Sequence, residues 1–206
     1  MGGRGASYAK ASGGGGGGAS EEKEILNSLS SEERATVERY AGYIAKDYQI
    51  YNPKNVEDVS KIEKAYDLEI ARAKDIKNLK TPEHAEIGYL TKGMDFSNED
   101  SYRYRNSSEM MHKIKETPTT VTYRTNHHGD KTMSKQKILE NRVDRLKYNK
   151  KQTMNEMKTD ALYKLAKKNK IKVTRKNGFM ENRTAINKSG NSELINKAKK
   201  LGLWSL

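Results

Sequence analysis

Lysines and arginines concentrate in one stretch near the C-terminal end of this 206-residue sequence, where their charges could bind phosphate groups. On a helix, several of them share a side opposite an apolar stripe, so they are expected to point outward as a band. Lysine outnumbers arginine, which predicts contacts with phosphates rather than with base edges. The predicted nucleic-acid-binding residues are Lys147, Lys150, Lys151, Lys158, Lys164, Lys167, Lys168, Lys170, Lys172, Arg175 and Lys176.

The distribution of charge along the chain supports the same interpretation. The whole sequence has 40 basic and 27 acidic residues, a net charge of +13, and residues 119–206 alone have a net charge of +15. The alternative is a lysine-rich surface that only keeps the protein soluble, because AT-rich genomes favour codons for Lys, Asn and Ile. Both interpretations remain open at the level of sequence.

Two adjacent histidines are the first candidates for catalysis. His127-His128 lies beside Asp130 and invites comparison with His-Asn-His nucleases. Those enzymes need an asparagine and a metal-binding histidine further along the chain, and no histidine follows His128. Adjacent histidines do not converge easily on one ion, and the sequence contains no cysteine, so we expect a solvated loop and no metal site.

Tyr123-Arg124 is similar to the first strand of ADP-ribosyltransferases, in which an arginine contacts the dinucleotide phosphate. Those enzymes also need a Glu-x-Glu pair late in the chain. The pair Glu22 and Glu24 precedes the arginine, which is the wrong order. Phosphate-binding glycine loops and nucleophile elbows do not occur either. We therefore expect a protein that is not an enzyme and has no cofactor.

Composition limits the location of the protein. Only 33% of the residues are hydrophobic and the mean hydropathy is −1.01, so no stretch approaches the roughly 20 apolar residues of a membrane span. The glycine-rich start is unlike a secretory signal, and cysteine is absent. These features predict a cytosolic protein, or one packaged by an assembly formed in a cytosol, with no membrane contact.

The first 81 residues divide into a tail and a helical region. Residues 1–20 include six consecutive glycines and are expected to be disordered. Residues 21–81 are predicted to form a hairpin of two amphipathic helices. The first follows a capping box at Ser30-x-x-Glu33; the second, capped by Asn55, extends to Thr81-Pro82 and includes Ile76 in its apolar stripe.

The middle, residues 82–133, is predicted to be an irregular linker. A short helix is expected from Ser108 to Glu116, and Thr119–Thr125 is predicted to be a strand because it is β-branched and aromatic. No pairing partner for this strand is evident.

The last segment, residues 134–206, is predicted to be a basic helical region. An apolar period begins after Ser134 and fits one long helix or two shorter ones. Ile171-Lys-Val173 is expected to be extended, and a final helix is expected over Ser192–Leu201, with Gly202 after its end and Trp204 folded back as a plug. The predicted fold class is mainly α.

Two resemblances bear on function. Met1-Gly-Gly-Arg-Gly-Ala-Ser7 resembles the opening heptad of many proteins in phages and prophages of Firmicutes, which implies phage origin and virion association or delivery. Thr159–Lys168, Ile171–Val173 and Ser192–Ile195 are similar to the parts of SAP and Rho-N-terminal-like helix–extended–helix modules, which bind nucleic acid. Residues 174–191 depart from that pattern.

The leading hypothesis is a non-enzymatic, phage-encoded accessory protein in the host cytoplasm or the virion. Its basic C-terminal region would contact the nucleic-acid backbone without sequence preference. Its N-terminal helices would contact a phage structural or host protein, or a second copy of the chain. The alternatives are a virion structural or head-assembly component without a nucleic-acid role, a toxin or effector, and an inhibitor of a host defence nuclease.

Overall fold

A computed structural model describes residues 17–46, 56–81, 83–86, 110–125 and 129–206. These residues are mainly helical, as the sequence predicts, with one antiparallel sheet. The elements are α1 (Gly17–Asn27), α2 (Ser31–Ala45), α3 (Asp58–Ala73), the 3-10 turn η1 (Ile76–Asn78), β1 (His84–Glu86), β2 (Met110–Glu116), β3 (Thr120–Thr125), β4 (Gly129–Ser134), α6 (Lys135–Lys168), α7 (Phe179–Lys188) and α8 (Ser192–Lys200).

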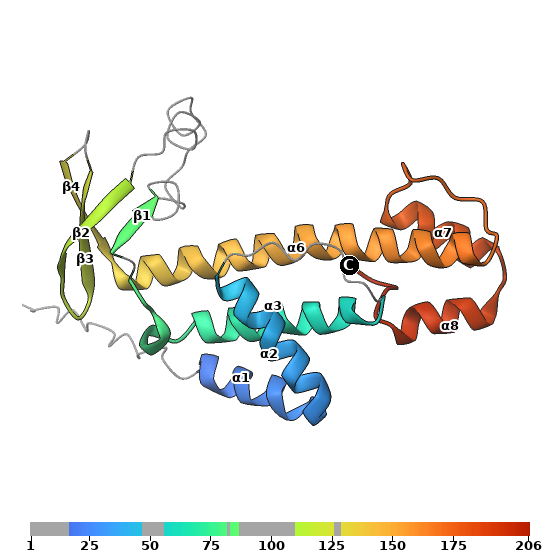
Figure 1. Cartoon of the computed structure of the whole chain (residues 1–206), viewed down its shortest axis with the longest axis horizontal. Coiled ribbons are helices and arrows are strands. Elements are labelled where there is room, and N and C mark those ends of the chain that lie inside the picture. The colour runs from blue at the N-terminus through green and yellow to red at the C-terminus, as the bar shows by residue number, and fades with distance from the viewer. Residues whose placement is uncertain (1–16, 47–55, 82, 87–109, 126–128) are drawn as a thin grey trace, which may run out of the picture.

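The long helix α6 organises the molecule. The sheet lies at one end of α6 and α7 and α8 lie at the other, while α1 to α3 lie along its side (Figure 1). With 34 residues, α6 is about 50 Å long. One apolar core runs through α2, α3, α6, α7 and α8, so the N-terminal helices share their interior with the basic C-terminal region.

Part of the segment predicted to be a disordered tail is helical. Residues 17–20 form the first turn of α1, and residues 1–16 lie outside the described residues. Gly18 is buried against α3, where a Cβ atom would lie only 2.6 Å from the carbonyl oxygen of Ala71. Arg72 binds Glu22 at 2.8 Å and Lys74 pairs with Glu21. Tertiary packing therefore orders glycines that composition alone assigns to a tail.

The two predicted N-terminal helices are α2 and α3. The capping box of α2 is confirmed: the Glu33 N–H donates to Ser30 Oγ at 3.3 Å, and the Ser30 N–H donates to the Glu33 carboxylate at 3.1 Å. The predicted cap Asn55 lies outside the described residues. The predicted end of the second helix is wrong, because α3 ends at Ala73. Ile76 lies in η1, where it is 45% exposed, and is not part of the apolar stripe.

The middle region contains a sheet, which confirms one prediction and corrects another. The strand predicted over Thr119–Thr125 is confirmed as β3, but the helix predicted over Ser108–Glu116 is wrong, because Met110–Glu116 is the strand β2. The order of the antiparallel strands is β1-β2-β3-β4. Both neighbours of β3 thus come from segments close to it in the sequence. Val121 and Tyr123 are fully buried beside Ile138 of α6.

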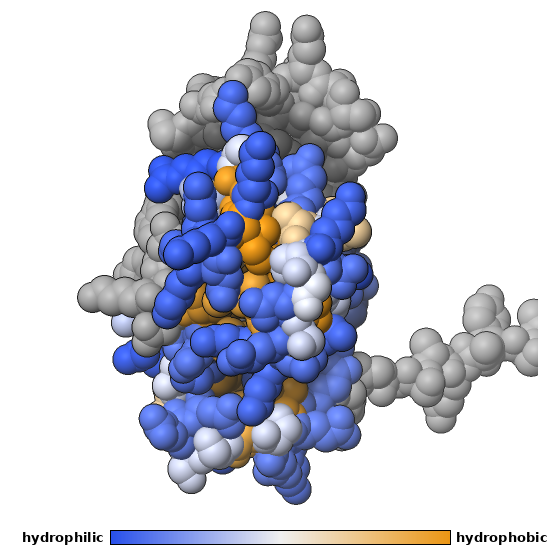
Figure 2. All heavy atoms as spheres, turned by 90° about the vertical axis from the view of Figure 1, so that its right-hand side faces the viewer, coloured by the Kyte–Doolittle hydropathy of each residue, from blue (hydrophilic) through white to orange (hydrophobic). Residues whose placement is uncertain are grey.

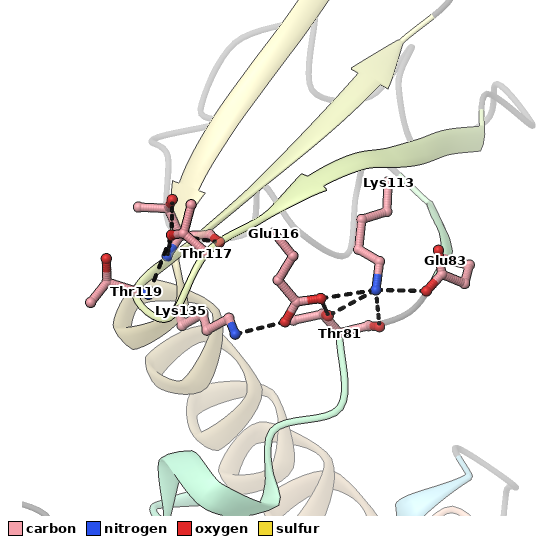
Figure 3. A network of polar contacts seen from close by, with 8 residues as sticks. Thr81, Glu83, Lys113, Glu116, Thr117, Thr119 and Lys135 are labelled. Atoms are coloured by element: carbon pink, nitrogen blue, oxygen red, sulfur yellow. Dashed lines mark hydrogen bonds and ion pairs between the residues drawn. The ribbon is translucent and has the colours of Figure 1, made fainter.

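A polar network joins this sheet to the start of α6 (Figure 3). The Glu116 carboxylate accepts from Lys113 at 2.9 Å and from the Thr81 hydroxyl at 2.8 Å, and it pairs with Lys135 at 2.6 Å. These contacts, that of Lys135 foremost, lower the pKa of Glu116 to about 2. Hydrogen bonds to Glu83 and then Glu116 raise the pKa of Lys113. The network fixes the sheet against α6 through charged groups rather than through a large apolar contact.

The C-terminal region is helical, as predicted, with one unexpected element. The apolar residues that recur after Ser134 belong to one long helix, α6, and the final predicted helix is α8. Gly202 follows α8 with a φ of 70°, and Leu203 behind it is fully buried. The plug therefore includes Leu203 as well as the half-buried Trp204. The helix α7 lies between the extended segment and α8, in the region where no element was predicted.

Candidate nucleic-acid interface

The eleven predicted phosphate-binding residues do not form one continuous band. Lys158 is the clearest exception, because its side chain is only 3% exposed. Its ammonium pairs with Glu63 of α3 at 2.7 Å and donates to the carbonyl oxygen of Ser205 at 3.0 Å. The side chain thus joins α6, α3 and the C-terminal segment from the inside, and the prediction that it contacts nucleic acid is wrong.

Lys150 also belongs to the contact between α3 and α6. Its ammonium lies 2.7 Å and 2.9 Å from the two carboxylate oxygens of Asp67, and 3.9 Å from Glu63. The sequence predicts an exposed Lys150, but its side chain is only 25% exposed because α3 covers that side of α6. Helical periodicity does not reveal which neighbouring helix supplies carboxylates, so this pair could not be predicted.

Three further predicted residues lie on the outer surface of α6. Lys147 and Lys151 are exposed, and Lys164 pairs with Asp160 at 2.6 Å within the same helix. Such an exposed i,i+4 pair contributes only a few tenths of a kcal/mol, so it leaves the ammonium of Lys164 available to another anion.

The remaining six predicted residues gather where α6 ends and the chain continues toward α7. We refer to them as the basic cluster. All six are exposed, and none of them forms an ion pair with a carboxylate in the part of the chain that the structure describes. The basic cluster comprises Lys167, Lys168, Lys170, Lys172, Arg175 and Lys176.

Hydrogen bonds hold the backbone of the basic cluster in a defined shape. Lys170 has a φ of 58°, and the following N–H, that of Ile171, donates back to the carbonyl of Ala166 at 3.0 Å. This closes α6 with a Schellman motif in which lysine occupies the left-handed position that glycine usually takes. Further along, the Thr174 hydroxyl donates to the Asn177 side chain at 2.6 Å. The cations are thus presented by an ordered loop.

The helices after the basic cluster add cations that the sequence analysis did not select. Residues 164–206 contain twelve basic and two acidic residues, a net charge of +10. The net charge of residues 119–206 already includes the additional residues, but they lie outside the thirty-residue stretch from which the predicted binding residues were chosen. They are Arg183 and Lys188 of α7 and Lys197, Lys199 and Lys200 of α8.

Trp204 orients two of these additional cations. The Arg183 guanidinium lies 5.5 Å from the centre of the Trp204 ring, and the Lys199 ammonium lies 5.8 Å from it. Both distances are typical of cation–π contacts. Figure 2 faces this end of the molecule and shows hydrophilic side chains around a narrower apolar strip. The described surface at this end is therefore mostly hydrophilic.

The residues considered for catalysis are placed as follows. His127 and His128 lie outside the described residues. Arg124 forms a bidentate pair with Asp130 at 2.8 Å and 3.0 Å, and its hydrogen bonds lower the pKa of the Asp130 carboxyl. Glu22 binds Arg72 on the side of α3. Within the described ranges, no group of three or more histidines and carboxylates is arranged to hold a metal ion.

Comparisons with known proteins do not add to this description. Neither family models nor curated proteins nor solved structures gave a match to the chain. None of the described helices is both long enough and apolar enough to cross a lipid bilayer.

Proposed function

We propose that the basic cluster binds the phosphate backbone of nucleic acid without sequence preference, and that the protein acts by binding rather than by catalysis. The observation that supports this most is the contrast between two lysines within α6 and the cations at and beyond its C-terminal end. Lys150 and Lys158 are covered and paired with carboxylates of α3, whereas the six cations of the basic cluster are exposed without such partners.

The chemistry of the cluster suits contacts with a phosphate backbone. Five of its six residues are lysines, which act as point charges and suit contacts that fix position rather than read bases. Binding releases the counterions condensed on the nucleic acid, so neighbouring cations add to the affinity together. The lysines of the cluster stabilise the negative C-terminal end of the α6 dipole, and their charges outweigh its repulsion of a phosphate.

The test compares two variants with equal losses of charge. In the first, Lys167, Lys168, Lys170 and Lys172 of the basic cluster become Gln. In the control, four exposed lysines far from the cluster become Gln: Lys23, Lys77, Lys80 and Lys115. Binding to a duplex DNA of random sequence is measured by fluorescence anisotropy at about 50 mM salt, where electrostatic binding is strong.

The cluster variant should bind much more weakly than the control. If each lost contact contributes about 0.5 kcal/mol, the affinity falls roughly 30-fold. The control should stay within a factor of about three of the unmodified protein, because its change in net charge acts only at long range. Equal losses in the two variants would mean that binding depends on overall charge, and no measurable binding by the unmodified protein would reject the proposal.

A further inference from the structure

The outer edge of β4 has backbone groups with no partner among the described residues. The Lys135 N–H donates to the carbonyl of Thr119 at 2.8 Å, so one step beyond the Thr120–Ser134 pair the β3–β4 register has a hydrogen-bonding position. Hydrogen-bonded and non-hydrogen-bonded pairs alternate along an antiparallel ladder. Lys131 and Met133 therefore direct their backbone groups toward β3, and Asp130 and Thr132 direct theirs away from the sheet.

This edge lacks several features by which proteins protect exposed strands. Proteins commonly block an edge with proline, a bulge or a covering element. The segment Gly129–Ser134 contains no proline, and its register with β3 continues without a shift from Ser134 to Gly129. The irregular register of the sheet lies instead on the interior strand β2, between Lys113 and Lys115. The edge is thus regular where an additional strand would pair.

We propose that β4 pairs with β4 of a second copy of the chain, antiparallel and around a two-fold axis at Thr132. In this register Thr132 faces its own counterpart, Asp130 faces Ser134, and Lys131 faces Met133. No two like charges face one another, and the acidic residue faces a hydroxyl. A two-fold contact requires this self-complementarity, since the same surface serves both copies.

The contacts available to the pair follow from the register. Two backbone hydrogen bonds join the facing Thr132 residues, and each Ser134 N–H can donate to the facing Asp130 carbonyl. The carbonyl of Ser134 already belongs to the first turn of α6, because Ser134 is its N-cap. On the exposed face, the Thr132 hydroxyl bonds Thr122 at 2.8 Å, so a row of threonines would continue across the axis.

The arrangement leaves the basic cluster uncovered. The sheet and the basic cluster lie at opposite ends of α6, about 50 Å apart along the helix (Figure 1). Pairing at β4 therefore gives a particle with two separate basic ends. The contact is short, so association should depend on concentration, and the inference stands or fails independently of nucleic-acid binding.

Single-cysteine crosslinking tests the register directly, because the chain contains no cysteine. Facing residues of a hydrogen-bonded pair have Cα atoms about 5.5 Å apart, within the range that a disulfide spans. A Thr132→Cys protein should form a covalent dimer under mild oxidation. A Thr122→Cys protein is the matched control: it loses the same Thr122–Thr132 hydroxyl bond, but it lies one strand further from the axis and should remain largely uncrosslinked.

Sedimentation of the full chain gives a second readout. The unmodified protein and Thr132→Val, which keeps the β-branch, should both sediment as a concentration-dependent dimer at up to about 200 µM. Thr132→Lys should be monomeric, because two ammonium groups would face each other at the axis. A monomeric unmodified protein over this range, or equal crosslinking of the two cysteine variants, would overturn the inference.

Discussion

Replacing Lys158 with methionine separates structural stability from nucleic-acid binding. Lys158 is the most deeply covered of the predicted phosphate-binding residues, and its ammonium contacts Glu63 at 2.7 Å and the Ser205 carbonyl at 3.0 Å. Methionine keeps the length and most of the volume of the side chain, so the packing of α6 against α3 should survive. The substitution removes only the charge and its hydrogen bonds.

The size of the effect follows from the environment of Glu63. Breaking a fully buried ion pair by removing one partner costs about 3–5 kcal/mol, because the remaining charge is buried alone. Glu63 is 29% exposed and retains Lys150 at 3.9 Å, so its carboxylate is not isolated. We therefore expect Lys158→Met to lower the free energy of unfolding by about 2 kcal/mol, which lowers the melting temperature of a chain of this size by roughly 4–8 °C.

The assay pairs thermal unfolding with DNA binding. Lys147→Met is the control, since Lys147 is exposed on the same helix and should change the stability by no more than about 0.5 kcal/mol. DNA affinity of Lys158→Met, measured well below its melting temperature, should equal that of the unmodified protein. A normal melting temperature together with weakened DNA binding would refute the structural role and indicate that Lys158 contacts nucleic acid.

Three further changes test other parts of the structure. Lys170→Gly should raise the free energy of unfolding, measured by chemical denaturation, by about 0.5–1 kcal/mol, because glycine adopts a φ of 58° without strain. The same change should weaken DNA binding. A lower stability would contradict the Schellman motif. Gly18→Ala should destabilise the packing of α1 by about 1–3 kcal/mol, because the added Cβ would meet the carbonyl oxygen of Ala71. The effect should appear as faster amide exchange in α1, and unchanged exchange would contradict this contact. Glu116 has a folded pKa of about 2 against about 4.3 when unfolded, so its stabilisation is present above pH 4.3 and is lost as the pH falls toward 2. Glu116→Gln should therefore lower stability at neutral pH and flatten the loss between these two values, and a mutant with the same acid dependence as the unmodified protein would refute the network.

Elements with strong local signals could be predicted from the sequence. The capping box at Ser30 sets the start of α2, the β-branched run gives β3, and Gly202 marks the end of α8. Each signal depends on residues close in the chain. The helix expected over Ser108–Glu116 is wrong even though the pairing partner is near in the sequence: Met110–Glu116 forms a strand because it pairs with β3, and the residues of the segment taken alone do not reveal that pairing.

The candidate site follows the same division. The concentration of cations could be counted, but whether a lysine is free or paired depends on α3, which is far away in the sequence. Lys158 pairs with Glu63 and Lys150 pairs with Asp67, whereas no described carboxylate pairs with Lys167 or Lys168. Periodicity places a side chain on a face of a helix, and only tertiary packing decides what covers that face.

The salt dependence of duplex binding tests the central claim most directly. The logarithm of the affinity should fall linearly with the logarithm of salt concentration, with a slope of about −0.9 for each phosphate contacted, and therefore close to −5 if all six residues of the basic cluster take part. Replacing Lys167, Lys168, Lys170 and Lys172 with Gln should make that slope shallower by up to about 3.6, while the control with Lys23, Lys77, Lys80 and Lys115 replaced should keep it. An unchanged slope in the cluster variant would show that these exposed lysines do not bind phosphate.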